Sequence, residues 1–298
     1  PTSTPFTPRC LDPTPPAALR WRRSVSDAVD GVAYLAAPED KAKLPLVHSG
    51  STKWAYKGFC EEAAAAAMSE PVVVVGGWAS PFVTRVCIAL RLKGVEYEFL
   101  QEAVGRKSEL LLRSNPVYKK MPVLLHGGRP VCESLVILQY VDEAFSAAGK
   151  PILPADPYRR AVHRFWAEYA DAKLHSPLRT LRGMVGGDKA DAAEQVSAAL
   201  RQLEEAFVEC SGGKPYFGGD DVGFLDIVVG SYIGWFGAAE RIAGLPVLDE
   251  ARTPRLAAWA VRFCAHEAVG DLVPDAARLV EFGEVLRAAL AANASSRP

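Results

Sequence analysis

Ser80 is the residue of this chain whose type and position best suit it to chemistry. Residues 72–75 are four consecutive valines, which predict a short buried strand, and Gly76 and Gly77 end that strand. Ser80 follows as the N-cap of a helix whose first residue is Pro81. The first turn of a helix carries unpaired backbone N–H groups and the positive end of the helix dipole. A hydroxyl at this place either caps the helix or helps to hold an anion.

The elements predicted around Ser80 alternate between strands and helices. A helix from residue 81 to about 93 has Val83, Val86 and Leu90 on one face, and Gly94 lies at its end. It is followed by a strand at 97–100, a short helix at 108–114, a hairpin of 123–125 and 130–132, and a helix at 134–145. The order β-α-β-α-β-β-α within residues 69–148 predicts a thioredoxin-like α/β domain.

The second half of the chain is predicted to be helical throughout. Residues 149–157 are rich in proline and form the predicted linker. Helical periodicity then covers residues 158–181, 190–210, 225–239, 255–265 and 276–291, without the alternation typical of strands. Asp226, near the start of one of these helices, is expected to bond free N–H groups in a structural role. We therefore expect an all-α second domain over residues 158–298.

The composition excludes several classes of function. The net charge is -1, so neither nucleic acid nor a membrane is an expected partner. No apolar run approaches the roughly 18 residues that a membrane-spanning helix needs. The six cysteines include no C-x-x-C pair, which argues against a disulfide framework and against a zinc or other metal site. This cysteine usage is typical of a reducing compartment, and the cytosol is the expected location.

Residues 1–68 differ from the rest of the chain. They open with a segment rich in Pro and Thr and show no sustained helical or strand period. Met68 is the first methionine and directly precedes the region of the first strand. We interpret residues 1–68 as a disordered extension or an artefact of gene prediction. A transit peptide is the alternative, because residues 1–26 contain Arg, Ser and Thr with Asp12 as their only acidic residue.

The position just before the first helix also excludes redox chemistry of the thioredoxin type. Such chemistry needs a cysteine there, but the chain has Ser80, with Val83 three residues later. Thiol–disulfide exchange therefore has no nucleophile. Cys87 lies deeper in the same helix on its apolar face, which is typical of a core residue.

Several motifs, each in register with the predicted elements, resemble the tau class of plant glutathione transferases. They are residues 78–82 (WASPF), 92–97 (LKGVEY), 107–111 (KSELL), 114–117 (SNPV), 118–124 (YKKMPVL), 132–135 (CESL) and 153–158 (LPADPY). Any one of these motifs alone would be weak, but together they are specific. The resemblance runs from about Met68 to the C-terminus, is strongest before Tyr169, and implies the glutathione transferase fold.

The resemblance also implies a role for each residue that matches a motif of the family. Ser80 would be the catalytic residue, because its hydroxyl would donate a hydrogen bond to the glutathione sulfur and favour the thiolate. The family's glutathione-binding residues map onto Ser80, Lys107, Lys120, Met121, Pro122, Glu133 and Ser134. The two lysines would bind the glycyl carboxylate, and Met121 would pair through its backbone, before a cis-proline at Pro122, with the cysteinyl part. Glu133 and Ser134 would bind the γ-glutamyl ammonium and carboxylate.

An electrophile site is expected between the two domains. Its candidate wall residues are Phe82, Trp166, Tyr169 and Trp235, although the last three are also candidates for the core. The expected activity is conjugation of the glutathione thiolate to hydrophobic electrophiles in detoxification, with reduction of organic hydroperoxides as a side activity. Glutathione would be a co-substrate, no cofactor is expected, and the resemblance implies a homodimer.

Two functions of other classes are the alternatives to conjugation. One is a non-catalytic carrier, or ligandin, of hydrophobic small molecules, which would keep the fold without the chemistry. The other is a thiol transferase or dehydroascorbate reductase, which would need a cysteine at position 80.

Overall fold

The first part of the chain forms a four-stranded mixed sheet. The computed structural model describes residues 69–295, with side chains as far as residue 289, so the interpretation of residues 1–68 lies outside the described residues. The strands are β1 (Val72–Gly76), β2 (Glu98–Gln101), β3 (Val123–His126) and β4 (Arg129–Cys132), in the spatial order β2-β1-β3-β4. β1 is parallel to β2 and antiparallel to β3, and β4 is antiparallel to β3.

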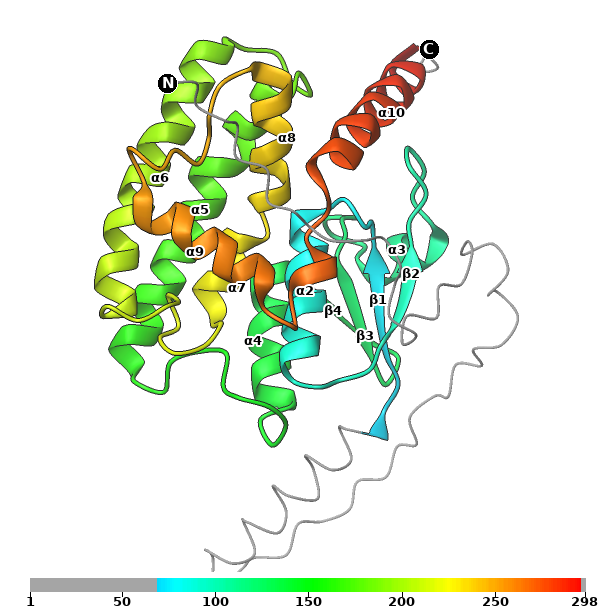
Figure 1. The fold of residues 1–298 in the computed structure, drawn as a ribbon. Coiled ribbons are helices and arrows are strands. Elements are labelled where there is room, and N and C mark those ends of the chain that lie inside the picture. The colour runs from blue at the N-terminus through cyan, green and yellow to red at the C-terminus, as the bar shows by residue number, and fades with distance from the viewer. Residues whose placement is uncertain (1–68, 296–298) are drawn as a thin grey trace, which may run out of the picture.

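Helices cover both faces of this sheet. α2 (Pro81–Leu92) and α4 (Ser134–Ala144) lie on the face towards the second domain, and Val74 of β1 belongs to the same core as these helices (Figure 1). The alternate residue, Val75, packs with Leu111 of α3 (Glu109–Ser114) on the opposite face. This order of elements confirms the predicted thioredoxin-like domain.

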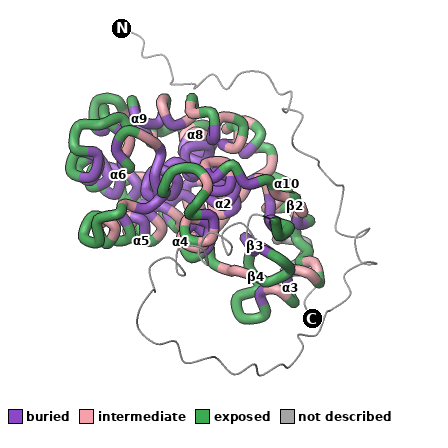
Figure 2. The backbone as a smooth tube through the Cα atoms, turned by 90° about the horizontal axis from the view of Figure 1, so that it is seen from below, coloured by how far each residue is buried: buried purple, intermediate pink, exposed green. Residues whose placement is uncertain are grey.

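The contact between β1 and α2 is unusually close. A Cβ atom added to Gly76 would lie 2.6 Å from Cγ2 of Val83, so only glycine fits at the end of the strand. Residues 83–90 of α2 are all buried, and α2 runs through the purple centre of the molecule in Figure 2. The start of α2 is therefore fixed firmly against the end of β1.

The second domain consists of helices, as predicted. They are α5 (Pro157–Leu181), α6 (Lys189–Ser211), α7 (Phe224–Gly230), α8 (Ile233–Ala243), α9 (Pro254–Ala265) and α10 (Ala276–Ser295), with the 3₁₀ turn η2 (Gly270–Leu272) before α10. The single helix predicted over 225–239 was wrong, because α7 and α8 are separated at Ser231 and Tyr232. No helix within residues 69–295 is long and apolar enough to cross a membrane.

Asp142 fastens the linker to the first domain. This residue lies near the end of α4, and its carboxylate accepts hydrogen bonds from the backbone N–H groups of Ile152 (2.8 Å) and Leu153 (2.9 Å). It also pairs with the buried Lys93 ammonium at the end of α2, at 2.7 Å. Three elements of the chain are thereby tied together where the two domains join.

Candidate functional site

The register of the sheet brings the predicted site residues to one edge. Val75 pairs with Val123, and Val123 pairs with Cys132, so the end of β1, the start of β3 and the end of β4 lie side by side. Ser80 follows β1, the Met121–Pro122 pair precedes β3, and Glu133 and Ser134 follow β4. β2 is parallel to β1 and ends beside Gly76, so residues 102–108 leave the sheet at the same edge.

Ser80 is the N-cap of α2, but its side chain does not cap the helix. Its backbone carbonyl accepts bonds from the N–H groups of Val83 (3.1 Å) and Thr84 (3.0 Å), and its own N–H donates to Gly77 O at 2.9 Å. The hydroxyl makes no capping bond, and Ser80 is partly exposed. The backbone is therefore fixed while the hydroxyl stays available, beside the unpaired N–H groups of a helix N-terminus.

The residues before Ser80 are held from both domains. The Trp78 N–H donates to Oε1 of Gln101 at 3.2 Å, which links the loop to the end of β2. The indole of Trp235, on α8, donates to the Ala79 carbonyl at 2.8 Å. The position of Ser80 thus depends on a contact from the helical domain.

Asn115 organises the loop that leads to Met121. Its side-chain amide donates to the Lys120 carbonyl at 2.9 Å, and its side-chain oxygen accepts from the Tyr118 N–H at 3.1 Å. The Met121–Pro122 peptide bond is cis, as the resemblance implied. A Cβ atom at Gly77 would lie 3.3 Å from the Met121 sulfur, so this loop meets the loop before Ser80.

The two predicted lysines lie on exposed loops at this edge. Lys107 directly precedes Ser108, whose N–H (3.0 Å) and hydroxyl (2.5 Å) both donate to the buried carboxylate of Glu102. Lys120 lies next to Met121 in the loop that Asn115 holds. Neither ammonium group pairs with a carboxylate among the residues that the structure describes. Both charges are available to an acidic ligand.

Glu133 and Ser134 form the turn into α4. Glu133 is exposed and has a φ of 69°, which is rare for a residue other than glycine and often marks a functional turn. Ser134 is buried at the first position of α4, where backbone N–H groups have no partner within the helix. The turn therefore presents a carboxylate and a helix N-terminus together.

Arg85 is a buried, fully hydrogen-bonded residue beside the candidate site that sequence reasoning missed. It is 0% exposed and donates to Ser134 Oγ (3.3 Å), to both carboxylate oxygens of Asp171 on α5 (2.8 and 2.5 Å), to Ser231 Oγ (3.0 Å) and to the Val228 carbonyl (3.2 Å). Burial alone would lower the pKa of Arg85, but the contact with Asp171 outweighs this effect and holds the pKa above its usual value. The one signal in the sequence was a charged residue near the start of a largely apolar helix, beside the apolar run 86–90.

Comparison with known proteins gives this arrangement a family. The model "Glutathione S-transferase, N-terminal domain" matches residues 70–143, and "Glutathione S-transferase, C-terminal domain" matches residues 186–262. Glutathione S-transferase U18 of Arabidopsis thaliana is 49% identical over 219 residues, which cover 73% of this chain and 96% of that protein. The chain belongs to the glutathione transferase family.

Further matches narrow the class of this transferase. The probable glutathione S-transferase GSTU6 of rice is 52% identical over 72% of this chain and 93% of that protein. The tau-class glutathione S-transferase of mango has a TM-score of 0.69 at 47% identity, over 72% of this chain and 98% of that chain. A rice glutathione transferase solved in complex with glutathione has a TM-score of 0.67 at 41% identity, over 74% and 97%. This chain is a plant tau-class glutathione transferase, an enzyme of EC 2.5.1.18.

The structure brings two of the four predicted electrophile-site residues of this transferase close to Ser80. The Phe82 ring lies 5.0 Å from the His175 ring of α5 and 6.3 Å from the Tyr232 ring. Trp235 is buried, and its indole bonds the carbonyl next to Ser80. Its burial and this bond give Trp235 a positioning role there.

The other two predicted aromatic residues lie further along α5. Trp166 and Tyr169 are in ring contact at 5.3 Å and pack against the main core. Trp166 precedes His175 by nine residues, which is about 13 Å along a helix axis. Their part in binding an electrophile stays a prediction.

Three of the described cysteines of the transferase have a raised thiol pKa. Burial raises the pKa of the Cys87 and Cys210 thiols to about 11, and burial followed by the Glu133 charge raises the pKa of the Cys132 thiol. Cys87 is a core residue, as predicted. Among the described residues no group of three or more His, Cys, Asp and Glu side chains could hold a metal ion.

Proposed function

We propose that this transferase binds glutathione at the end of the sheet where β1 and β4 end and β3 begins. The Ser80 hydroxyl would donate a hydrogen bond to the thiolate. The observation that carries this proposal is the Ser80 Oγ, which the N-cap position presents but the helix does not use. A free thiol has a pKa of about 8.5, and the thiolate is the nucleophile. A hydrogen bond to the charged form and the positive end of a helix both lower that value.

The remaining residues of the edge match the charges of the tripeptide. Lys107 and Lys120 supply unpaired ammonium groups for the glycyl carboxylate, and the backbone of Met121 faces the cysteinyl part. The helix N-terminus at Ser134 suits the γ-glutamyl carboxylate, and Glu133 suits its ammonium group. Arg85 would act as a positioning residue. It lies where α2 contacts the helical domain, and its guanidinium donates a hydrogen bond to the Ser134 hydroxyl.

Catalysis would consist of thiolate formation and alignment of two substrates. The sulfur attacks the electrophilic carbon, a carbon–sulfur bond forms, and for a chloroarene the carbon–chlorine bond breaks to release chloride. Holding both reactants removes much of the entropic barrier to a bimolecular step. Phe82, beside the serine, would form one wall of the site for hydrophobic electrophiles, and Trp166, Tyr169 and Trp235 stay candidates.

Assembly and location are proposals of the same kind. We expect a homodimer from the family resemblance and a cytosolic location from the free cysteines Cys87, Cys132, Cys210 and Cys264. Hydroperoxide reduction stays a prediction as a side activity. No observation on the described residues favours the non-catalytic carrier.

The replacement Ser80→Ala tests the serine mechanism. Steady-state conjugation of a generic chloronitroarene would be followed across pH, together with ultraviolet titration of the bound thiol. We expect the pKa of bound glutathione to rise towards its free value, and kcat/KM below that pH to fall by about 100-fold. Glutathione binding, measured by calorimetry, should weaken far less, because only the thiolate loses its donor.

A matched control separates this effect from general damage. Ser197→Ala removes a hydroxyl on α6 that contacts only surface arginines, and it should leave the pH profile unchanged. An equal conjugation rate in Ser80→Ala and the wild type would show that the serine mechanism is wrong. Disulfide reduction that survives Ser80→Ala would instead favour a thiol transferase.

A further inference from the structure

Arg182 lies at the end of α5, against the residues that position Ser80. It is the C-cap of α5, and its guanidinium carbon lies 3.6 Å from the centre of the Trp235 ring. The same indole donates to the Ala79 carbonyl at 2.8 Å. Arg182 is therefore separated from the loop of Ser80 by one side chain, on the side of the helical domain.

The guanidinium of Arg182 is largely without acceptors. Arg182 is only partly exposed, yet its one hydrogen bond runs from Nε to the Leu178 carbonyl of its own helix, at 3.0 Å. Both Nη groups lack an acceptor, and no carboxylate pairs with the charge, among the described residues. Arg85, on the other side of the same region, makes five hydrogen bonds and pairs with Asp171. An arginine has five donors, so most of those of Arg182 remain unused.

The neighbours of Arg182 add positive charge. Burial, followed by the charge of Arg179 one turn earlier, lowers the pKa of Arg182 to about 10. Burial, followed by the charges of Arg179 and Arg182, also lowers the pKa of His175, the histidine beside Phe82. Arg287 of α10 donates to the Arg182 carbonyl at 3.1 Å and brings a further cation. The described residues leave this positive charge uncompensated.

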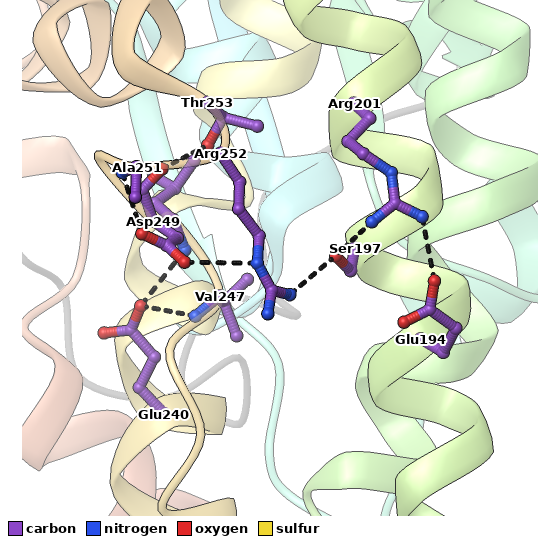
Figure 3. Close-up of polar contacts among 10 residues, drawn as sticks. Glu194, Ser197, Arg201, Glu240, Val247, Asp249, Ala251, Arg252 and Thr253 are labelled. Atoms are coloured by element: carbon purple, nitrogen blue, oxygen red, sulfur yellow. Dashed lines mark hydrogen bonds and ion pairs between the residues drawn. The ribbon is translucent and has the colours of Figure 1, made fainter.

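Two exposed arginines of the helical domain, one on α6 and one just before α9, are paired. Arg201 donates to Glu194 at 2.8 Å and to Ser197 at 3.1 Å, and Arg252 lies 3.4 Å from Asp249 (Figure 3). These exposed side chains are less in need of partners than Arg182, because water solvates them. Arg182 differs from these two arginines, because it is only partly exposed and has no carboxylate partner among the described residues.

We propose that the electrophile side of this site selects hydrophobic electrophiles that carry an anionic group, which Arg182 and Arg179 bind. The proposal rests on the proposed function and adds a substrate class to it. An apolar body would lie near Phe82, and a carboxylate or sulfonate would receive hydrogen bonds from the Nη groups of Arg182. A planar guanidinium suits a carboxylate in particular, because two parallel bonds can form.

Glutathione itself is a poor candidate for the ligand that binds the Arg182 guanidinium. Its two carboxylates are matched by the lysines and by Ser134, all of which lie on the side of the sheet. Arg182 belongs to α5 and stacks on Trp235 of α8, so it lies on the helical-domain side of the loop before Ser80. The stacking on Trp235 and the helix C-terminus each stabilise the cation. These contacts explain why the charge is tolerated, but they do not occupy its Nη groups.

The test compares two electrophiles that differ in charge alone. 4-Chloro-3-nitrobenzoate and the neutral 4-chloro-3-nitrobenzamide both undergo substitution of chloride by the thiolate, and each rate is divided by its uncatalysed rate with glutathione. We expect the wild type to prefer the benzoate. Arg182→Met keeps an apolar side chain over Trp235 and removes the charge. It should reduce the ratio of the two kcat/KM values by about tenfold, mainly through KM for the benzoate.

The controls make each outcome decisive. Arg201→Met, the same replacement at an arginine already paired with Glu194, should leave the ratio unchanged. An equal fall for both electrophiles in Arg182→Met would show that Arg182 only supports Trp235, and an unchanged ratio would show that no anion binds there. Calorimetric binding of the two glutathione conjugates, which requires no turnover, should show the same loss of preference for the charged compound in Arg182→Met. If Ser80→Ala keeps full activity but the Arg182→Met ratio falls, the serine mechanism fails while the anion site stands.

Discussion

The N-termini of α7 and α2 in this transferase differ in whether their polar groups are hydrogen-bonded within the protein. At the start of α7, the buried carboxylate of Asp226 accepts bonds from the N–H groups of Phe217 (2.9 Å), Gly218 (2.7 Å) and Gly223 (3.0 Å). The indole of Trp259 adds a fourth bond at 2.7 Å. Every one of these groups is satisfied inside the protein, which confirms the structural role predicted for Asp226.

The start of α2 leaves its polar groups unused. The hydroxyl of Ser80 makes no capping bond, although the residue has the N-cap position. Lys107, Lys120 and the Nη groups of Arg182 also lack partners among the described residues. Buried polar groups are costly when unpaired, whereas these groups are exposed or partly exposed and can meet a ligand without that cost. The difference indicates that the paired groups of α7 hold the fold, while the available groups around α2 suit the proposed site.

The largest expected effect on stability is at the start of α7, where the polar groups are hydrogen-bonded to Asp226. Asp226→Ala would leave four donors, three of them on buried residues, without an acceptor, so we expect the free energy of unfolding to fall by about 3–5 kcal/mol. Urea unfolding followed by circular dichroism measures this change. Asp220→Ala, at an exposed carboxylate of the same loop that pairs with Lys214, should have little effect. Equal losses in the two variants would mean that the bonds of Asp226 do not hold this region.

His163 extends the comparison, because its ring nitrogens have no hydrogen-bond partner although it is a buried core residue on α5 and not a residue of the site. It is 1% exposed, and neither ring nitrogen has a hydrogen-bond partner among the described residues. Burial, followed by the charge of Arg159, lowers its pKa to about 4. The unfolded chain, with a histidine pKa of about 6.5, therefore takes up a proton before the folded one does. The stability that depends on neutral His163 is complete above that value and is lost as the pH falls towards 4.

His163→Leu should remove this acid sensitivity. We expect the wild type to lose about 1–2 kcal/mol more than the variant between neutral pH and about pH 5. Urea midpoints at the two pH values give the measurement. A variant that keeps the full pH dependence of the wild type would assign the acid sensitivity to other groups. An unchanged activity at neutral pH would show that an unsatisfied group outside the site has no part in binding.

The sequence predicted the strand-end edge well because its signals are local. Gly76 and Gly77 ended the first strand, Gly127 and Gly128 marked the hairpin, and helix periodicity gave the bounds of α5 and α6 to within one residue. The cis peptide bond at Met121–Pro122 came from the family resemblance alone. Nothing in the local sequence distinguishes a cis from a trans bond at this position.

The contacts between domains could not be predicted, because their partners are distant in the chain. Arg85 bonds residues that are 49, 86 and 146 positions away. One of them, Ser231, interrupts the apolar run that suggested a single helix, and its hydroxyl bonds the Val228 carbonyl at 2.8 Å. The sequence also could not tell whether the Ser80 hydroxyl caps its helix or helps to hold an anion, since only the structure shows whether a hydroxyl bonds its own helix.

The smallest expected effect compares two serines that hold the same position in two helices. Ser108 is the N-cap of α3, and its hydroxyl accepts from the Leu111 N–H at 3.0 Å and donates to Glu102. Ser108→Ala should therefore cost about 1 kcal/mol of the free energy of unfolding, as the loss of a capping serine usually does. Ser80→Ala removes no such bond and should leave the urea midpoint almost unchanged, although it lowers activity. If Ser80→Ala proved the more destabilising of the two, the hydroxyl of Ser80 would be serving the fold, and its availability to a thiolate would be lost as an argument.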